Sequence, residues 1–224
     1  NQCAYVCPHA VIRPFLLDEE EMAKAPEGMP TIKALGRGMN ELNYKIQVSP
    51  LDCTGCSACV DVCPAPRGKA IVMKSTQSQI EKNEIEYTDY LFNNVSYKDK
   101  ILGKNTVKGS QFAKPLFEFS GACAGCGETP YIKLVTQLFG ERMMVANATG
   151  CSSIYGASTP STPYTTAQNG CGPAWASSLF EDNAEYGYGM FQAINTIRHR
   201  ILKRMEEIKE DVSPKLAELF TLFE

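Results

Sequence analysis

The spacing of apolar residues changes along the chain and divides it into three regions. Before residue 76 the apolar stretches are short, for example AIVMK at 70–74, and an alternating stretch at 44–48 predicts a strand. Residues 76–115 are polar with scattered aromatic side chains, which indicates a helix and a connector. From residue 116 onward, Gly, Ala, Ser and Thr surround separate apolar runs. The pattern therefore predicts two folded parts joined by a connector.

The third region has the clearest periodicity. Apolar residues at helical spacing over 129–140 predict a helix that ends at Gly140, and the apolar run at 142–149 predicts a buried strand. A long amphipathic pattern over 186–211 predicts a second helix, which stops before Pro214. The order of cysteine loop, helix, strand and second cysteine loop is typical of an α/β arrangement.

We expect three segments in the folded chain. Residues 1–75 would form a small cysteine-rich domain, in which 14–50 is an inserted loop because this stretch starts acidic and has a centre rich in Pro and Gly. Residues 76–115 would connect this domain to an α/β part at 116–224.

Composition and charge argue against some classes of function. With 224 residues, 44% of them apolar, the chain can bury one or two cores, and its formal net charge of −3 does not favour a nucleic-acid or membrane-surface partner. The sequence has no apolar run of about eighteen residues, and its first residues, NQCAYVCPHA, lack the features of a secretion signal. We therefore expect a cytoplasmic protein that binds neither nucleic acid nor membrane.

The ten cysteines carry the strongest chemical signal. A small disulfide scaffold would be shorter and richer in cysteine, so we interpret them as metal ligands, with disulfides as the alternative. The stretch CTGCSACVDVCP fits C-x2-C-x2-C-x3-C-P, the run found in bacterial two-cluster ferredoxins, with Cys53, Cys56, Cys59 and Cys63. Zinc sites also use C-x2-C spacing, but seldom three evenly spaced cysteines followed by Cys-Pro.

A second, partial run stands at the start of the sequence. Cys3 and Cys7 have its x3-C-P ending without its beginning, so we expect the chain to be a fragment. The fourth cysteine of each run binds the other cluster. One [4Fe–4S] cluster is therefore expected at Cys7, Cys53, Cys56 and Cys59. Cys3 and Cys63 would hold half of another, and such clusters transfer single electrons.

A third cysteine group lies in the α/β part. Cys123 and Cys126 stand in a loop of small residues, FSGACAGCGETPY, and Cys151 follows the strand expected at 142–149. These thiols make most of a third cluster site, and counting cysteines alone offers Cys171 as the fourth ligand. Glu128 is two residues after Cys126, within about 7 Å of chain, so whatever it touches is near the cluster. The alternative is a solvated glutamate at a helix N-terminus.

Five stretches together closely resemble the pyruvate:ferredoxin (flavodoxin) oxidoreductase family: NQCAYVCPHAVIRPF, CTGCSACVDVCP, GACAGCGETPY, NATGCSSIYG and GCGPAWASSLFEDNAEYG. The resemblance covers nearly the whole chain. It implies an enzyme of anaerobic metabolism that oxidatively decarboxylates pyruvate on thiamine diphosphate and Mg²⁺ and transfers the acetyl group to coenzyme A. Electrons would pass through three [4Fe–4S] clusters to ferredoxin or flavodoxin. The full-length protein would be a homodimer.

The resemblance also implies roles for particular residues. Glu128 would contact the aminopyrimidine of thiamine. Cys123, Cys126 and Cys151 would be three ligands of the cluster nearest thiamine, with Cys151 also lying against the cofactor. The fourth ligand would come from beyond residue 224, which leaves Cys171 as a small buried residue.

The same resemblance sets the expected fold. Residues 1–75 would be an α+β ferredoxin-like domain with two [4Fe–4S] clusters, and 116–224 the first part of an α/β thiamine diphosphate-binding domain. The Gly-Asp-Gly motif for Mg²⁺ and diphosphate is absent, so the chain alone is expected to be inactive without the remaining domains. The alternative function is a non-catalytic polyferredoxin-type electron-transfer module, which would have no use for the GACAGCGETP loop.

Four other residues receive simpler interpretations. His9 follows Cys7-Pro8 and is expected on the surface or beside the cysteine ligands. His199 lies among basic residues and is expected on a solvated helix face. Trp175 and Phe180 are expected in the core.

Overall fold

The computed structural model describes residues 1–157 and 162–222. They form two compact units, one made of Asn1–Met144 and Gly150–Ala174 and the other of Val145–Thr149 and Trp175–Glu224. This division differs from the boundaries expected at residues 75 and 115. Within residues 1–157 and 162–222, no helix combines the length and the apolar character needed to cross a bilayer.

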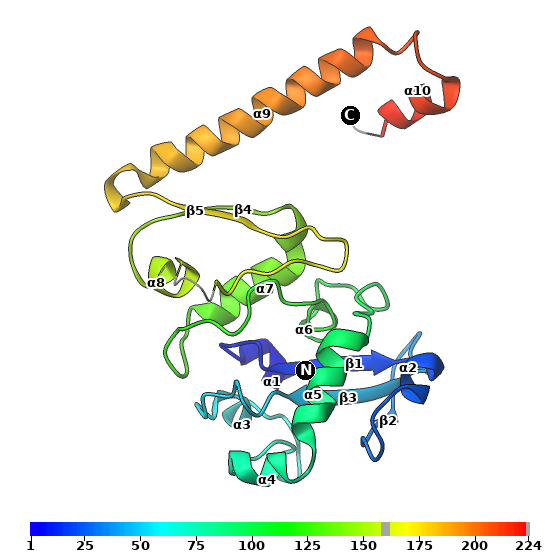
Figure 1. Cartoon of the computed structure of the whole chain (residues 1–224), viewed down its shortest axis with the longest axis vertical. Helices are drawn as coiled ribbons and strands as arrows, with labels where there is room; N and C mark the ends of the chain where they lie inside the picture. Colours follow the sequence, from blue (N-terminus) through cyan, green and yellow to red (C-terminus); the bar gives the residue numbers. More distant parts are fainter. Residues whose placement is uncertain (158–161, 223–224) are drawn as a thin grey trace. The chain divides into compact units, whose positions relative to one another are not determined.

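The first unit contains an antiparallel three-stranded sheet in the order β1-β3-β2, formed by β1 (Ile12–Leu17), β2 (Ile32–Lys33) and β3 (Asn43–Val48). β1 pairs with β3 along its whole length, with Ile12 opposite Val48 (Figure 1). The strand predicted at 44–48 is confirmed. The expectation of an inserted loop at 14–50 is wrong for its first residues, because residues 14–17 belong to β1. All six residues of β1 are buried, so the strand has no alternation of apolar and polar positions for sequence analysis to detect.

The helices around this sheet carry the first cysteines. α1 (Gln2–Val6) contains Cys3 and packs against α3 (Ala58–Asp61). Cys7 follows α1 directly and lies in a small core with Val11 and Ile12, against which Cys59 packs. α2 (Glu19–Ala23) follows β1 and is capped by the side chain of Asp18.

The segment expected to be a helix and a connector contains α4 (Thr76–Ile80), α5 (Glu84–Asn94) and the short α6 (Val107–Ser110). The expected helix is confirmed. α5 packs against β3, and Tyr87 and Leu91 share a buried cluster with Phe15 of β1. The segment is therefore part of the core of the first unit, which explains why the unit does not end at residue 75.

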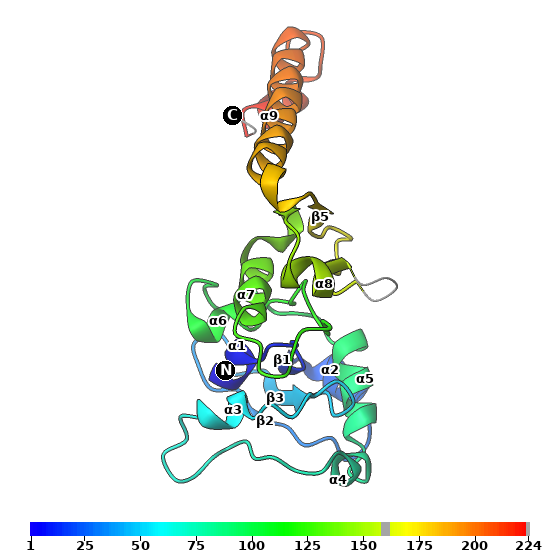
Figure 2. The ribbon, with the colours of Figure 1, turned by 90° about the vertical axis from the view of Figure 1, so that its left-hand side faces the viewer.

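α7 (Thr129–Phe139) confirms the helix predicted at 129–140, with Gly140 as its cap; the 3-10 turn η1 (Gly140–Arg142) follows. Its buried face is polar, however: Thr129, Lys133, Thr136 and Gln137 face inward. Tyr131, Val135 and Phe139 are exposed. Three of these side chains bond to neighbouring backbone: Thr136 accepts the N–H of Leu116 at 3.1 Å, Lys133 donates to the carbonyl of Tyr5 at 3.0 Å, and Gln137 donates to the carbonyl of Ala113 at 2.9 Å. α7 also packs against α1, which lies beside it in Figures 1 and 2.

β4 (Met144–Asn147) confirms the strand predicted at 142–149, and it pairs with β5 (Ala174–Ser177) in a two-stranded sheet. The expectation that this strand is buried is wrong, because Met144 is 45% exposed and only Asn147 is buried. α8 (Cys151–Ala157) follows β4 and begins at a cysteine.

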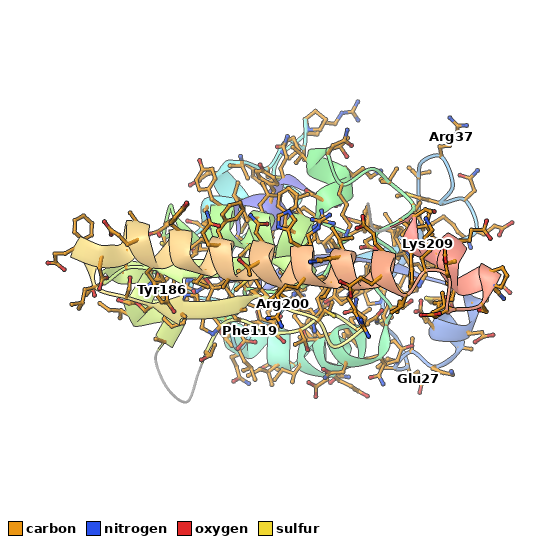
Figure 3. All side chains as sticks on the ribbon, turned by 90° about the horizontal axis from the view of Figure 1, so that it is seen from above. Glu27, Arg37, Phe119, Tyr186, Arg200 and Lys209 are labelled. Carbon is orange, nitrogen blue, oxygen red and sulfur yellow. The ribbon has the colours of Figure 1, made fainter. Side chains whose placement is uncertain are left out.

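The second unit is dominated by the long helix α9 (Asn183–Glu207), which follows the 3-10 turn η2 (Phe180–Asp182) and precedes α10 (Pro214–Phe220). The helix predicted at 186–211 is confirmed with shifted ends. α9 has no buried residue, and its exposed side chains include Tyr186 and Arg200 (Figure 3). His199 is exposed as expected. Phe180 is 76% exposed, so its expected core position is wrong, whereas Trp175 is half-buried.

Candidate metal centre

Four cysteines from two distant parts of the sequence line one small cavity. The cavity has a volume of about 30 Å³, and its lining includes Cys7, Cys53, Cys56 and Cys59. Cys7 is placed by the end of α1, and Cys59 by α3. These are the four residues expected to share a cluster, and the structure brings them together. The binding of iron and sulfide by them stays a prediction.

The loop that carries Cys53 and Cys56 has an unusual backbone. Gly55 has a φ of +71° and Ser57 a φ of +57°, so both residues are in the left-handed region. Gly55 is suited to this conformation because it has no Cβ. Successive residues of alternating hand turn their N–H groups toward one side of the chain, which favours an anionic group there.

The electrostatics of these thiols fit binding to a positively charged metal core that lies between them. Burial raises the pKa of the Cys59 thiol to about 11, and the charges of the neighbouring Cys7, Cys3, Cys53 and Cys56 raise it further. Thiols this close cannot all ionise unless positive charge is supplied between them. Iron coordination removes the thiol protons outright, so the donor set suits a cluster.

Cys3 and Cys63 form a second, more open pair. Burial raises the pKa of Cys3, and the charge of Cys63 adds to this shift. The Sγ atom of Cys63 accepts the N–H of Ala70 at 3.2 Å. Bonds from the N–H groups of Ala65 and Ala70 lower the pKa of Cys63, which favours its thiolate. The charges of Cys3 and Cys63 thus act on each other, and their binding of one cluster stays a prediction.

The loop of Cys123 and Cys126 is a tight turn at the start of α7. The N–H of Cys126 donates to the carbonyl of Cys123 at 3.0 Å, and Gly125 has a φ of +74°. Burial alone would raise the pKa of Cys126, but bonds from the N–H groups of Thr129 and Glu128 lower it overall. The first turn of α7 thus stabilises a thiolate at Cys126.

Glu128 is fixed by a residue that sequence analysis did not single out. The hydroxyl of Tyr155, on α8, donates to Oε1 of Glu128 at 2.8 Å. Cys151 and Tyr155 are four residues apart, so they lie on one face of α8. Glu128 is exposed at the start of α7, but it is more than a solvated side chain, because the hydroxyl of Tyr155 is hydrogen-bonded to its carboxylate. The spacing of Tyr155 from Cys151 is the only sequence signal that could have found this residue.

The two cysteine loops lie against each other. A Cβ atom built on Gly125 would be 3.6 Å from the Cβ of Cys56. His9 connects the same two regions: its Nδ1 bonds to the carbonyl of Ser120 at 3.0 Å, and its own carbonyl accepts the N–H of Phe119 at 3.0 Å. His9 is buried and lines the cavity of Cys7. The expected surface position is therefore wrong, and the expected place beside the cysteines is confirmed.

Cys171 differs from its expected environment. It is exposed rather than buried. It lies in a turn, where its N–H donates to Oδ1 of Asn169 at 2.9 Å and its carbonyl accepts the N–H of Ala167 at 2.8 Å. Hydrogen bonds of its own N–H and carbonyl groups, rather than packing of its side chain, hold Cys171 in place.

Within the part of the chain that the structure describes, no three His, Cys, Asp or Glu side chains gather closely enough to hold a single metal ion. A four-iron cluster bonds each thiolate through a different iron, so its ligands need not meet at one point.

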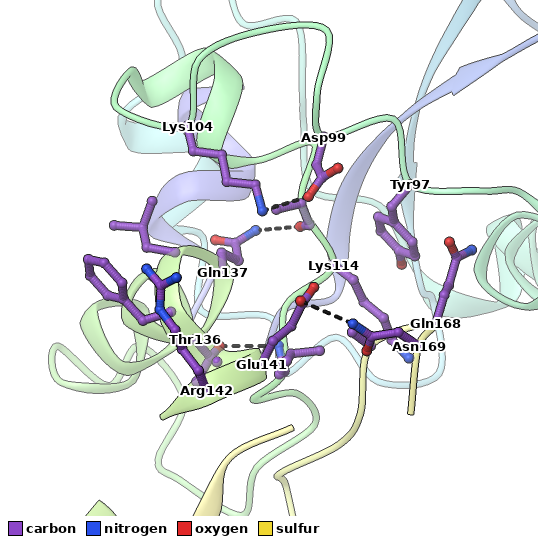
Figure 4. A pocket seen from close by; sticks show the side chains of 16 residues that line it. Tyr97, Asp99, Lys104, Lys114, Thr136, Gln137, Glu141, Arg142, Gln168 and Asn169 are labelled. Atoms are coloured by element: carbon purple, nitrogen blue, oxygen red, sulfur yellow. Dashed lines mark hydrogen bonds and ion pairs between the residues drawn. The ribbon is translucent and has the colours of Figure 1, made fainter. Parts of the chain in front are cut away.

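A larger cavity, of about 360 Å³, lies elsewhere in the first unit (Figure 4). Its charged groups are partly paired with each other: Nζ of Lys104 is 2.6 Å from Oδ2 of Asp99, and Nδ2 of Asn169 donates to Glu141 at 3.1 Å. Its lining contains none of the cysteines and does not include Glu128. The candidate site is therefore the cysteine-lined region.

Comparison with known proteins agrees with this location. Residues 1–68 match the family of 4Fe-4S dicluster domains. The chain is 56% identical over 206 residues to a pyruvate-flavodoxin oxidoreductase of Enterobacter agglomerans, which covers 92% of this chain and 17% of that protein. It is 54% identical over 217 residues to the pyruvate:ferredoxin oxidoreductase of Moorella thermoacetica, covering 96% and 18%.

The name of a third relative gives a different electron acceptor. The pyruvate dehydrogenase [NADP(+)] of Cryptosporidium parvum is 55% identical over 215 residues, covering 95% of this chain and 11% of that protein. The chain spans less than a fifth of the length of each of these relatives. The match to 4Fe-4S dicluster domains covers the first part of this mixed α/β chain.

Proposed function

Because this chain is related over nearly its whole length to pyruvate-flavodoxin and pyruvate:ferredoxin oxidoreductases, we propose that it is the electron-transfer part of such an enzyme and the start of its thiamine-binding part. The reaction would convert pyruvate and coenzyme A to acetyl-CoA, CO2 and a proton, with two electrons passed to ferredoxin or flavodoxin. The observation that carries the proposal is the convergence of four cysteines on one cavity beside a second cysteine loop.

The cysteines would divide among three sites. One [4Fe–4S] cluster would be held by Cys7, Cys53, Cys56 and Cys59, whose side chains line one cavity. Cys3 and Cys63 would hold part of a second, and Cys123, Cys126 and Cys151 part of a third. When bound, these clusters supply one-electron transfer. The protein contributes thiolates and, around Cys63 and Cys126, backbone N–H groups that stabilise negative charge.

Glu128 would bind the aminopyrimidine ring of thiamine diphosphate. Its carboxylate is exposed, and the hydroxyl of Tyr155 already orients one oxygen, which leaves the other free to share a proton with a ring nitrogen. Thiamine diphosphate, held through Mg²⁺, supplies the carbon centre that makes decarboxylation feasible. The position of Glu128, two residues after Cys126, supports transfer of electrons from substrate to the nearest cysteine site.

The similarity to these oxidoreductases also suggests the location, assembly and electron acceptor of the whole protein. We propose a cytoplasmic homodimer in which other domains of the same enzyme complete the substrate site. The names of the relatives include flavodoxin, ferredoxin and NADP(+), so reduction assays with each of these would identify the acceptor.

The test uses the whole protein, prepared anaerobically. We expect iron and acid-labile sulfide in equal amounts, and pyruvate oxidation that depends on coenzyme A. Cys56→Ser should lower the iron content, because Cys56 lines the cavity, whereas Cys171→Ser should leave it unchanged. Metal without sulfide would contradict the cluster assignment. Intact clusters without pyruvate oxidation would instead favour an electron-transfer module.

A further inference from the structure

Lys133 is a buried lysine that ties α7 to the end of α1. Its side chain is only 2% exposed. Its Nζ atom donates to three backbone carbonyls, those of Ala4, Tyr5 at 3.0 Å and Cys7 at 3.3 Å. The carbonyls lie at the C-terminal end of α1, the helix that contains Cys3 and leads into Cys7.

The contacts of Lys133 require a charged ammonium. A protonated lysine has three N–H donors and no acceptor, and three carbonyl oxygens receive them here. A neutral amine has only two N–H groups and would leave one carbonyl facing its lone pair. The side chain therefore places a full positive charge in the interior of the first unit.

A buried charge is costly unless an opposite charge lies near it. The ion pairs formed by the described residues do not include Lys133. Its bond to the carbonyl of Cys7 instead places the ammonium beside a residue proposed to bind a cluster, which would supply negative charge.

We propose that Lys133 is the internal counter-charge of the two cysteine sites that contain Cys7 and Cys3, and that it raises their reduction potential. This inference rests on the proposed function, because it requires anionic clusters at these cysteines. Adding an electron makes a cluster more negative, so a fixed cation in a poorly solvated region stabilises the reduced form more than the oxidised form. Lys133 is a tuning residue: it touches the backbone of one ligand and acts through charge.

The effect should be larger at the site of Cys7 than at that of Cys3. The ammonium bonds directly to the carbonyl of Cys7, whereas on the Cys3 side its partners are the carbonyls of the two following residues, Ala4 and Tyr5. Cys7 is buried, whereas Cys3 and Cys63 are only partly buried. A less solvated site is screened less by water.

The test compares Lys133→Met and Lys133→Arg in the whole protein, prepared anaerobically. Redox titration followed by electron paramagnetic resonance gives the midpoint potential of each cluster, and iron and sulfide analysis gives cluster content. For Lys133→Met we expect the equilibrium constant for reduction of the Cys7 site to fall about tenfold or more, which is about 59 mV for one electron. Lys133→Arg should stay near the wild-type potential, because it keeps the charge.

The matched control is Lys108→Met. Lys108 also donates to a backbone carbonyl, that of Leu35 at 3.1 Å, but it is exposed, so its loss should leave the potentials unchanged. If Lys133→Met loses its clusters while Lys133→Arg keeps them at the native potential, the need for charge is supported. Native potentials in Lys133→Met, or loss of clusters in both variants, would overturn the inference. Wild-type protein without iron and sulfide would instead refute the proposed function.

Discussion

The hydroxyl oxygen of Tyr155 lies 2.8 Å from a carboxylate oxygen of Glu128, so a side chain from α8 fixes the acid that stands just before α7. Tyr155 is itself held rigidly: it is buried, and its ring packs edge-on against Phe117, with centroids 5.7 Å apart. Burial and the bond to Glu128 raise the pKa of Tyr155, so it keeps its proton and remains a donor. The direction of the Glu128 carboxylate is therefore set before any ligand binds.

Tyr155→Phe removes this hydrogen bond and little else. A bond to a charged group contributes about 1.5–3 kcal/mol, which corresponds to a decrease of roughly 10-fold to 150-fold in the kcat/KM for pyruvate that the proposed function predicts for the whole protein. Steady-state kinetics with saturating thiamine diphosphate would measure it, and the iron content should be unchanged. Tyr131→Phe is the control, because Tyr131 lies on α7 but is 70% exposed. Equal kinetics for the two variants would show that Tyr155 does not position Glu128.

Gly125→Ala should disturb the junction of the two cysteine loops. Gly125 has a φ of +74°, where an alanine costs about 1 kcal/mol of backbone strain, and this strain would arise next to Cys56, whose Cβ would be 3.6 Å from the added Cβ. We expect a lower iron content and altered paramagnetic resonance spectra. Gly127→Ala provides a matched comparison in the same loop, because a Cβ there would meet no atom within 4 Å. Wild-type spectra for Gly125→Ala would contradict this expectation.

Glu118→Ala should strongly destabilise the first unit. Arg13 is buried on β1, bonds to Glu118 and to the hydroxyl of Tyr97 at 2.9 Å, and stacks on Phe92 at 4.2 Å. Removing one partner of a buried ion pair leaves the other charge uncompensated, at a cost of about 3–5 kcal/mol. Urea unfolding followed by circular dichroism would measure the loss.

The control for this ion pair is Glu207→Ala. Glu207 pairs with Arg204 at 3.0 Å, but the Arg204 side chain is 71% exposed. Exposed pairs contribute at most about 1 kcal/mol. Similar losses for Glu118→Ala and Glu207→Ala would mean that burial of Arg13 does not matter.

Acid should weaken the contact between α2 and the segment that follows α5. Burial raises the pKa of Glu21, but bonds from Lys98 and Ser96 outweigh it, so the pKa lies below its usual 4.5. The folded state then binds protons less readily than the unfolded state. The stabilisation is complete above about pH 4.5 and is lost as the pH falls through the lower, folded pKa.

Glu21→Gln tests this contribution. The variant should lose about 1–3 kcal/mol near pH 6, because Glu21 accepts bonds from Ser96 and Lys98, and the loss should shrink toward pH 3. Unfolding by urea at a series of pH values would give the difference. A constant difference between the two proteins across this range would contradict the assignment to Glu21.

The elements found from sequence were those with a regular pattern. The alternation at 44–48 marked β3, and the helical spacing at 129–140 marked α7. β1 was missed because every residue in it is buried, Arg13 included, so its apolar and polar positions do not alternate. The buried polar face of α7 was also missed, because periodicity locates an apolar stripe and cannot say which face finds hydrogen-bond partners.

The candidate site could also be predicted only where its residues are close in the sequence. Spacing in the sequence was enough to group Cys53, Cys56 and Cys59, since local loops bring such residues together. Their grouping with Cys7 depended on knowledge of two-cluster ferredoxins. Tyr155 and Lys133 act through contacts between residues 27 and 129 positions apart, which no local pattern encodes.

The stretch that matches the dicluster family ends at residue 68, but its physical boundary lies elsewhere. His9 and the last carbonyls of α1 find their partners at Phe119, Ser120 and Lys133. Excision at residue 68 would strip these groups of their partners and would also remove Met73, which lines the cysteine cavity. The matched stretch therefore depends on α7 and on residues 119–120 for part of its stability.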